Sequence, residues 1–252
     1  MDDDDLALLV DLHKRQKRQG PGGEAETSKA MALANLQESV PLRIADIGCG
    51  TGASTLQLAH SLNAEITAVD FLPDFIETLK DNAEAEGLSE KIETLVCSME
   101  QLPFAEEDYD VLWSEGAIYN MGFEKGVNEW RRFLKPGGIL VVSEITWLTN
   151  TRPPELQQYW DAQYPEIATA SQKIKILEAS GYSPIGYFVL PENCWLVNYY
   201  RPLQDGFADF VARQNNDERA ASIVAAEKEE IALYEKNKPY YGYGMYIARK
   251  FG

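Results

Sequence analysis

The stretch Ile44-Ala45-Asp46-Ile47-Gly48-Cys49-Gly50-Thr51-Gly52-Ala53 decides the fold of this chain. Its first residues form an apolar segment, predicted to be a buried strand, that runs directly into a loop with glycine at every second position. Glycine has no Cβ atom, so such a loop can turn tightly and its backbone can approach a ligand. Apolar residues at helical spacing follow Gly52, and the free N–H groups at a helix N-terminus favour an anionic ligand group. The pattern predicts a strand, a loop and a helix that together bind a nucleotide-like ligand.

A second predicted strand supplies an acid suited to a nucleoside. Residues 66–69 are mostly apolar and lead to Asp70. A carboxylate at this strand end could accept hydrogen bonds from both ribose hydroxyls of an adenosine. Phe71 comes next, and its ring could pack on adenine or simply fill the core at the strand end. These residues indicate a nucleoside without choosing between nucleoside cofactors.

The glycine spacing is compatible with two ligand classes. The letters Gly48-x-Gly50-x-x-Ala53 also match a dinucleotide fingerprint. The fuller pattern Asp46-x-Gly48-x-Gly50-x-Gly52 resembles motif I of the class I S-adenosylmethionine-dependent methyltransferases. The resemblance implies that the strand-end acid and the glycine backbone hold the methionine part of the cofactor. The candidate residues in this segment are Asp46, Gly48, Cys49, Gly50 and Gly52.

Later segments extend the resemblance. Residues 133–138 read Phe-Leu-Lys-Pro-Gly-Gly and precede an apolar strand, which looks like the fifth-strand signature of this family. Residues 100–104 resemble the family's segment that closes over the adenine edge. Many relatives have aspartate where this chain has Ser98, so the backbone N–H of Met99 is the preferred adenine contact, beside Ser98 itself. The segments 18–23, 114–120 and 191–195 also resemble a subgroup of small bacterial proteins assigned only to the methyltransferase class.

The order of elements predicts the fold class. Strands and helices alternate up to Glu144, which is typical of an α/β protein with a Rossmann-like, doubly wound sheet. We expect helices over 74–86, 124–134 and 171–179, and late strands over 185–190 and 243–248. The resemblance implies seven strands, mostly parallel, with the last one antiparallel beside the fifth. The predicted single domain 1–252 comprises an N-terminal helical cap (1–40), a cofactor-binding core (41–145) and a helical lid insert (191–240).

The insert is predicted to contain helices over 204–213 and 218–236, and it is rich in aromatic residues. Such an insert is where this fold builds a substrate lid. The rings could wall a pocket for an apolar, aromatic or cationic acceptor, or they could cement the insert to the sheet. The residues concerned are Trp195, Tyr199, Tyr200, Tyr234, Tyr240 and Tyr241. Both interpretations stay open at this point.

Candidates for the acceptor site follow the predicted strand ends and the N-terminal loop. Glu115, with Ser114 before it as a further cofactor contact, ends the fourth predicted strand. Its carboxylate could bind the methionine ammonium, deprotonate an acceptor or cap the next helix. Tyr119 could orient an acceptor, and the basic residues of 14–18 are interpreted mainly as a solvated helix face. The other acceptor-site candidates are Arg18, Glu144, Trp147 and Trp195.

Composition narrows the partners. The chain of 252 residues carries a formal net charge of −17, which would repel nucleic-acid backbones and anionic membrane surfaces. No apolar run is long enough to span a membrane and the chain opens Met-Asp-Asp-Asp-Asp, which together indicate a cytoplasmic protein. Three widely spaced cysteines fit reduced thiols, and no His/Cys cluster suits zinc, so no metal is expected. A small neutral or cationic molecule is the predicted acceptor.

The predicted reaction is direct, in-line transfer of a methyl group from S-adenosylmethionine to that small molecule, with S-adenosylhomocysteine as product. Positioning and exclusion of water can supply much of the acceleration. Two other classes compete with this prediction. One is an NAD(P)-dependent oxidoreductase that uses the same glycine loop, and the other is a non-catalytic S-adenosylmethionine-binding module.

Overall fold

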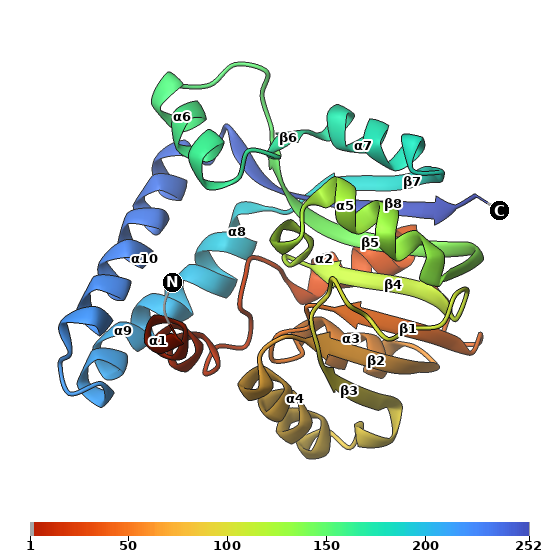
Figure 1. Ribbon diagram of the computed structural model, residues 1–252, viewed down its shortest axis with the longest axis horizontal. Coiled ribbons are helices and arrows are strands. Elements are labelled where there is room, and N and C mark those ends of the chain that lie inside the picture. Colours follow the sequence, from red (N-terminus) through yellow and green to blue (C-terminus); the bar gives the residue numbers. More distant parts are fainter. Residues whose placement is uncertain (1–2, 252) are drawn as a thin grey trace.

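A central sheet carries the fold (Figure 1), and the computed structural model describes residues 3–251. The first two residues of the acidic start and Gly252 lie outside this range. The long strands have the order β3-β2-β1-β4-β5-β8-β7. Their bounds are β1 (Leu42–Ile47), β2 (Ala64–Asp70), β3 (Ile92–Val96), β4 (Tyr109–Glu115), β5 (Leu134–Trp147), β7 (Tyr182–Val189) and β8 (Tyr241–Lys250). The first five pair in parallel, whereas β8 is antiparallel to both β5 and β7. The predicted doubly wound sheet, with its last strand antiparallel beside the fifth, is confirmed.

Helices cover both faces of this sheet because successive strand side chains point to opposite sides. Ile44 and Trp113 belong to the apolar cluster under α2 (Glu24–Leu33), α3 (Ala53–Ser61) and α4 (Pro73–Ala85). Their chain neighbours Ala45 and Leu112 belong to the opposite cluster, under α5 (Phe123–Trp130) and α7 (Ala170–Ala179). Burial on both faces explains why these strands read as nearly continuous apolar runs.

One predicted helix boundary is wrong. The helix expected over 124–134 ends as α5 at Trp130, and a 3₁₀ turn (Arg131–Phe133) follows it. Leu134 already lies in β5, opposite Tyr109 of β4, and the register shifts between Tyr109 and Val111. Pro136 cannot donate a helical hydrogen bond and Gly137 adopts φ +77°, so the chain cannot continue as a helix here.

The sequence patterns did not predict two short elements beyond β5. These are α6 (Pro154–Gln163) and the strand β6 (Ala168–Thr169), which pairs in parallel with the end of β5. Both lie between the fifth strand and α7, where the chain is rich in polar residues and the alternating pattern is weak. They extend the sheet edge toward the C-terminal helices in Figure 1.

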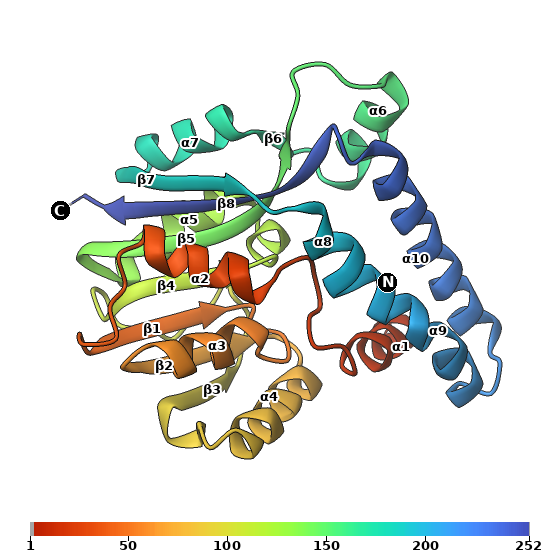
Figure 2. The same ribbon diagram turned by 180° about the vertical axis from the view of Figure 1, so that it is seen from behind.

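A third group of helices lies beyond the carboxyl ends of the parallel strands (Figure 2). It comprises α1 (Asp3–His13), α8 (Glu192–Trp195), a π-helical turn (Leu196–Tyr200), α9 (Arg201–Arg213) and α10 (Glu218–Asn237). The predicted helices over 204–213 and 218–236 are confirmed as α9 and α10. Asp11 on α1 accepts hydrogen bonds from Arg213 and Gln214 at 3.1 and 3.0 Å, so the N-terminal helix meets the end of α9 here. None of the helices described within 3–251 has both the length and the apolar character needed to cross a membrane.

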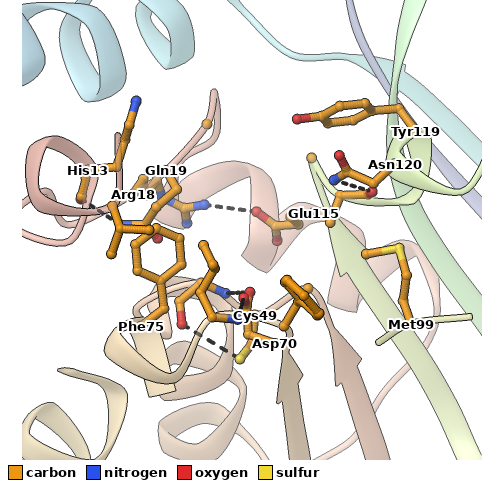
Figure 3. Close-up of a pocket in the computed structure, with 18 of the residues that line it drawn as sticks. His13, Arg18, Gln19, Cys49, Asp70, Phe75, Met99, Glu115, Tyr119 and Asn120 are labelled. Atoms are coloured by element: carbon orange, nitrogen blue, oxygen red, sulfur yellow. Dashed lines mark hydrogen bonds and ion pairs between the residues drawn. The ribbon is translucent and has the colours of Figure 1, made fainter. Parts of the chain in front are cut away.

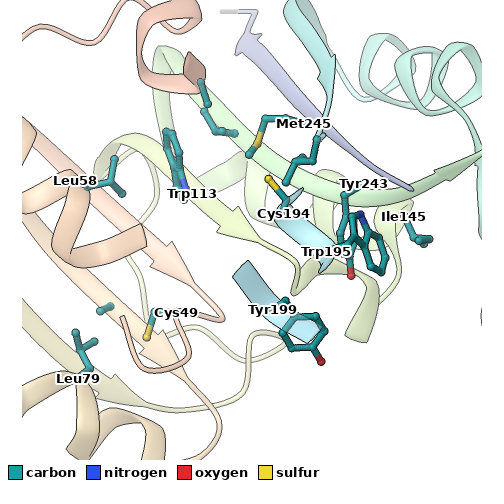
Figure 4. Packing of buried hydrophobic residues seen from close by; sticks show 14 of the residues in the cluster. Cys49, Leu58, Leu79, Trp113, Ile145, Cys194, Trp195, Tyr199, Tyr243 and Met245 are labelled. Carbon is teal, nitrogen blue, oxygen red and sulfur yellow. The ribbon is translucent and has the colours of Figure 1, made fainter. Parts of the chain in front are cut away.

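Aromatic rings join the insert to the sheet (Figure 4). Trp195 of α8 stacks on Tyr234 of α10 and on Tyr243 of β8, with ring centroids 4.2 and 5.1 Å apart. Tyr241 of β8 meets Trp147 of β5 edge to face at 6.3 Å, and it also meets Trp195 of the insert edge to face at 6.2 Å. Aromatic pairs of this kind stabilise beyond the area they bury. For these rings, cementing the insert to the sheet is the observed role.

Candidate active site

A cavity of about 990 Å³ lies between the carboxyl ends of β1, β2 and β4 and the third group of helices. One wall is the glycine loop with Asp70 and Phe71. The opposite wall comes from α1, the π-helical turn and α10, through residues such as His13, Tyr199 and Glu230. Figure 3 shows His13 and Arg18 on one side, Tyr119 on the other, and Asp70 below. Ligands of open α/β sheets bind at this edge, so the fold itself directs attention to this cavity.

The glycine loop has the backbone that its sequence predicts. Gly48 adopts φ +76°, and a Cβ atom there would collide with the Cβ atom of Ala117. The N–H groups of Gly48 and Cys49 both donate to the carbonyl of Val69, at 2.8 and 2.9 Å. The loop is therefore fixed against the end of β2, and its surface stays free of side chains where a ligand would approach.

Asp70 holds the opposite side of that surface. Its carboxylate accepts hydrogen bonds from the N–H groups of Gly50 at 2.9 Å and Leu72 at 3.0 Å, one on each oxygen. Each carboxylate oxygen can accept a further bond, and the side chain lines the cavity. Burial raises the pKa of Asp70. The backbone donors orient this acid for two neighbouring hydroxyl groups, as a ribose would present them.

Asp46 lies behind the loop rather than on the cavity surface. It is fully buried, and Ser54 and Thr55 at the start of α3 donate to its Oδ2 at 2.8 and 2.7 Å. Burial raises the pKa of Asp46 to about 7. Ser114 is also fully buried, and neither residue is among those that line the cavity. In this structure Asp46 braces the junction of β1, the loop and α3.

Glu115 forms a buried ion pair with Arg18. Arg18 Nη1 lies 2.9 Å from Glu115 Oε2, while Thr27 Oγ1 and Trp113 Nε1 donate to Oε1 at 2.7 and 3.0 Å. The Arg18 and Glu115 side chains are only 9% and 6% exposed, so the interpretation of Arg18 as part of a solvated face is wrong. Glu115 also makes no side-chain cap to the 3₁₀ turn Ile118–Asn120 that follows. Both carboxylate oxygens are thus occupied by donors, which favours a binding role over that of a base.

Gln19 connects the N-terminal segment to the glycine loop, and the sequence patterns did not single it out. Its Oε1 accepts from the Thr51 N–H, and its Nε2 donates to Thr51 Oγ1, both at 2.9 Å. The same amide donates to the carbonyls of His13 and Gln16. A polar residue next to Gly20 gave no periodic signal, so only the folded chain reveals this contact.

The predicted adenine-side residues gather at one rim of the cavity. Phe71, Ser98 and Met99 all line it, together with Cys97 and Glu100. Phe71 is 65% exposed, so its ring is not part of the core. Trp130 Nε1 donates to the carbonyl of Met99 at 3.1 Å and fixes that segment against α5. An exposed ring at a strand end beside the cavity leaves a face available for a planar base.

Three predicted acceptor-site residues do not reach the cavity. Glu144 is fully buried and pairs with Lys173 of α7 at 3.0 Å, so its charge is used within the core. Trp147 packs against Tyr241 within the sheet, and Trp195 packs between the insert and the sheet against Tyr234 and Tyr243. The acids and rings that do line the acceptor end are Glu227, Glu230, Tyr119 and Tyr199. Of these, Tyr119 was predicted as an acceptor-site residue, and Tyr199 was among the insert rings for which a pocket wall or a packing role stayed open. Burial raises the pKa of the Tyr119 phenol.

The described part of the chain, residues 3–251, contains no group of three or more His, Cys, Asp or Glu side chains placed to hold a metal ion. His13 pairs with Glu227, and His60 pairs with Glu86 on the surface. Cys49, Cys97 and Cys194 are free thiols, as their spacing predicts.

Comparisons with known proteins agree with this site. A family model described as a methyltransferase domain matches residues 44–138. The uncharacterized methyltransferase YodH of Bacillus subtilis is 30% identical over 175 residues, which cover 69% of this chain and 73% of that protein. An uncharacterized protein of Haemophilus influenzae is 29% identical over 146 residues, 57% of each chain. The present chain therefore spans little more than half of the Haemophilus relative.

A solved structure shows the same fold over nearly the whole chain. It is a S-adenosylmethionine-dependent methyltransferase from Geobacter sulfurreducens in complex with S-adenosylhomocysteine, 17% identical, covering 96% of this chain and 97% of that one, with a TM-score of 0.83. Together with the sequence matches, this places the chain in the class I S-adenosylmethionine-dependent methyltransferases. The alternative of an NAD(P)-dependent oxidoreductase is thereby excluded.

Proposed function

We propose that this protein transfers the methyl group of S-adenosylmethionine directly to a small molecule bound in the same cavity. The observation that carries the proposal is that one continuous cavity joins the glycine loop and Asp70 to an acceptor end walled by helices. When bound, S-adenosylmethionine supplies an electrophilic methyl group on a sulfonium. The cavity volume of about 990 Å³ is at the upper end of the range for small-molecule sites.

The residues of the glycine-loop side fit the cofactor. Asp70 would accept hydrogen bonds from the ribose hydroxyls, while Phe71 would pack on the adenine with Ser98 and the Met99 backbone at its edge. Arg18 and Glu115 offer opposite charges 2.9 Å apart, and these match the carboxylate and ammonium groups of the methionine end. Gly48, Cys49 and Gly50 would supply backbone contacts between these two ends.

The acceleration would come from positioning rather than from a strong base. Glu115 is held by Arg18, Thr27 and Trp113, so accepting an acceptor proton would cost it these contacts. Tyr119, 40% exposed and lining the cavity, is placed to orient an acceptor. An acceptor and a methyl donor that are held side by side in one site react as if they were parts of one molecule. Exclusion of water strengthens the contacts that align them.

The cap (1–40) and the insert (191–240) are proposed to act together as a lid over this site. Asn198 donates to the carbonyl of Gly22 at 2.8 Å, which links the two segments directly. Hydrogen exchange tests this: S-adenosylhomocysteine should slow exchange in both segments. Protection confined to residues 44–120 would show that neither segment closes on the ligand.

Calorimetry with S-adenosylhomocysteine, followed by a radiolabelled methyl-transfer screen of fractionated cell extract in EDTA, tests the proposed function. We expect tight binding and label in small molecules, because the chain's charge of −17 disfavours nucleic acids and anionic membranes. Label mainly in RNA, DNA or lipid, or activity only after Mg²⁺ is restored, would contradict it. Tight binding with no transfer to any acceptor would support the second candidate, a non-catalytic S-adenosylmethionine-binding module.

A further inference from the structure

We infer that the acceptor is a small molecule with an amino group, which is bound as its ammonium ion at the end of the cavity between α1 and α10 and anchors the molecule there. An ammonium nitrogen has no lone pair, so the methyl group goes to another nucleophilic atom of the same molecule. The inference rests on the proposed function, because it assigns a ligand class to the acceptor end of the same site. It follows from the charge, the unpartnered polar atoms and the aromatic rings that the fold brings together there.

Charge at this end of the cavity is negative. Glu227 and Glu230 enter from α10, and the one arginine that lines the cavity, Arg18, is already paired with Glu115. Glu227 Oε1 lies 3.3 Å from His13 Nε2, while Glu227 Oε2 is buried with no hydrogen-bond partner among the described residues. A buried carboxylate oxygen without a donor is costly, and a ligand that brings N–H donors and positive charge would satisfy it.

Glu230 is the second acid at this end of the cavity. Its Oε1 accepts from the Tyr200 hydroxyl at 3.0 Å, and its side chain lines the cavity. Burial raises the pKa of Glu230, with the neighbouring charge of Glu227 adding to the effect. A cation between these two acids would offset both the cost of burying Glu230 and its repulsion from Glu227, whereas a carboxylate or a phosphate group would add to the repulsion.

Tyr199 points to the same ligand independently of the acids. It is only 8% exposed, and it lines the cavity. It lies on the π-helical turn Leu196–Tyr200, an irregularity that is frequent at functional sites. With Tyr119 across the cavity, it offers a ring face and a hydroxyl oxygen to an ammonium group.

The rest of this end is apolar. Leu6, Leu9 and Val10 of α1 line the cavity beside His13. An amine with an apolar body would therefore place its charged end between Glu227 and Glu230 and its body against α1. A neutral alcohol of the same shape would keep the apolar contacts but lose the ion pairs.

Calorimetry on the protein saturated with S-adenosylhomocysteine tests the inference with matched probes. Tyramine is compared with tyrosol, and n-hexylamine with 1-hexanol, because each pair differs only in an ammonium or a hydroxyl group. We expect at least one amine to bind about tenfold tighter than its alcohol, as a charge-assisted hydrogen bond predicts. Glu230→Gln and Glu227→Gln should each lower that amine's affinity about tenfold and leave the alcohol unaffected.

Two controls keep the outcomes separate. Glu229→Gln removes the same charge from α10 at a residue that does not line the cavity, so it should change amine affinity less than about twofold. Tyr199→Phe deletes only the hydroxyl and should weaken the amine about threefold. Affinity for S-adenosylhomocysteine, measured first in every variant, reports folding and the cofactor site.

The results discriminate between the two proposals. If the wild-type protein does not bind S-adenosylhomocysteine, the proposed function fails. If it does, but neither amine binds better than its alcohol, or the glutamine variants bind the amine as well as wild type, the amine inference fails while the methyltransferase site stands.

Discussion

The two halves of the cavity are built from the chain in opposite ways. On the glycine-loop side, partners lie close in sequence: Asp46 contacts residues 8 and 9 positions away, and Gly50 contacts Asp70 at a separation of 20. At the acceptor end, His13 meets Glu227 across 214 residues. The first half is set by one strand-loop-helix unit and its neighbouring strand, whereas the second exists only when the N-terminal helix α1 meets α10 of the insert. This difference explains why a sequence motif predicts the class of the cofactor but not the class of the acceptor.

Arg18 joins the two halves, so its loss should have the largest effect. Arg18→Ala leaves the Glu115 carboxylate buried beside Thr27 without its cation, and unfolding should require about 3–5 kcal/mol less free energy. Urea denaturation measures this. Lys17→Ala is the matched control, because the Lys17–Glu24 pair is exposed and should contribute below about 1 kcal/mol. Equal small losses for both variants would show that the ion pair does not couple the cap to the sheet.

Removing Asp70 from the glycine-loop side of the cavity should disable cofactor binding without unfolding the chain. Asp70→Ala should weaken S-adenosylhomocysteine binding by about 1.5–3 kcal/mol, the value of hydrogen bonds to a charged acceptor. Calorimetry decides, with Asp74→Ala as control because Asp74 pairs with Lys14 on the surface. Unchanged affinity in a folded Asp70→Ala protein would remove this acid from the site.

Asp46, behind the glycine loop, should make the stability of the folded protein depend on pH. Its pKa is raised in the folded protein to about 7 from the ordinary value of 3.8, because it is buried. The folded state therefore binds more protons than the unfolded state in this window, so stability should fall as pH rises from about 4 to about 7 and then level off. Asp46→Asn keeps an oxygen acceptor for Ser54 and Thr55 and should abolish this pH dependence, because the amide does not titrate. Parallel denaturation curves for both proteins across this window would contradict the assignment.

The smallest effect on cofactor binding is expected from the hydrogen bonds by which Gln19 links the N-terminal cap to the glycine loop. Gln19→Ala removes the contacts to Thr51 and should weaken S-adenosylhomocysteine binding by about 1 kcal/mol. Gln16→Ala keeps the backbone carbonyl that Gln19 contacts and should leave affinity unchanged. A loss as large in Gln16→Ala as in Gln19→Ala would mean that the segment acts through its general packing and not through this amide.

The sequence by itself determined the elements whose cause is local. Glycines at 48, 50 and 52 require a tight loop. Apolar strands that alternate with helices along the chain require a sheet covered on both faces, and Asp70 ends its strand at the ligand-binding edge of such a sheet. The order of strands and helices up to Glu144 then predicts the doubly wound arrangement. Even the helices of the insert follow from their spacing alone, because helix periodicity needs no partner to be visible.

Only the tertiary structure decided which side chains meet at the acceptor end. Glu144 and Trp147 looked like site residues from their place after the predicted fifth strand, but both lie within β5, and Lys173 and Tyr241 take up their charge and ring within the core. Arg18 looked solvent-exposed until the fold placed Glu115 beside it, 97 residues away in the chain. Glu230 carried no motif at all, and the aromatic content of the insert did not distinguish Tyr199, which lines the cavity, from Trp195, which packs against the sheet. Ion pairing, burial and ring contact act through space, so a pattern read along the chain registers them only when both partners belong to the same local unit.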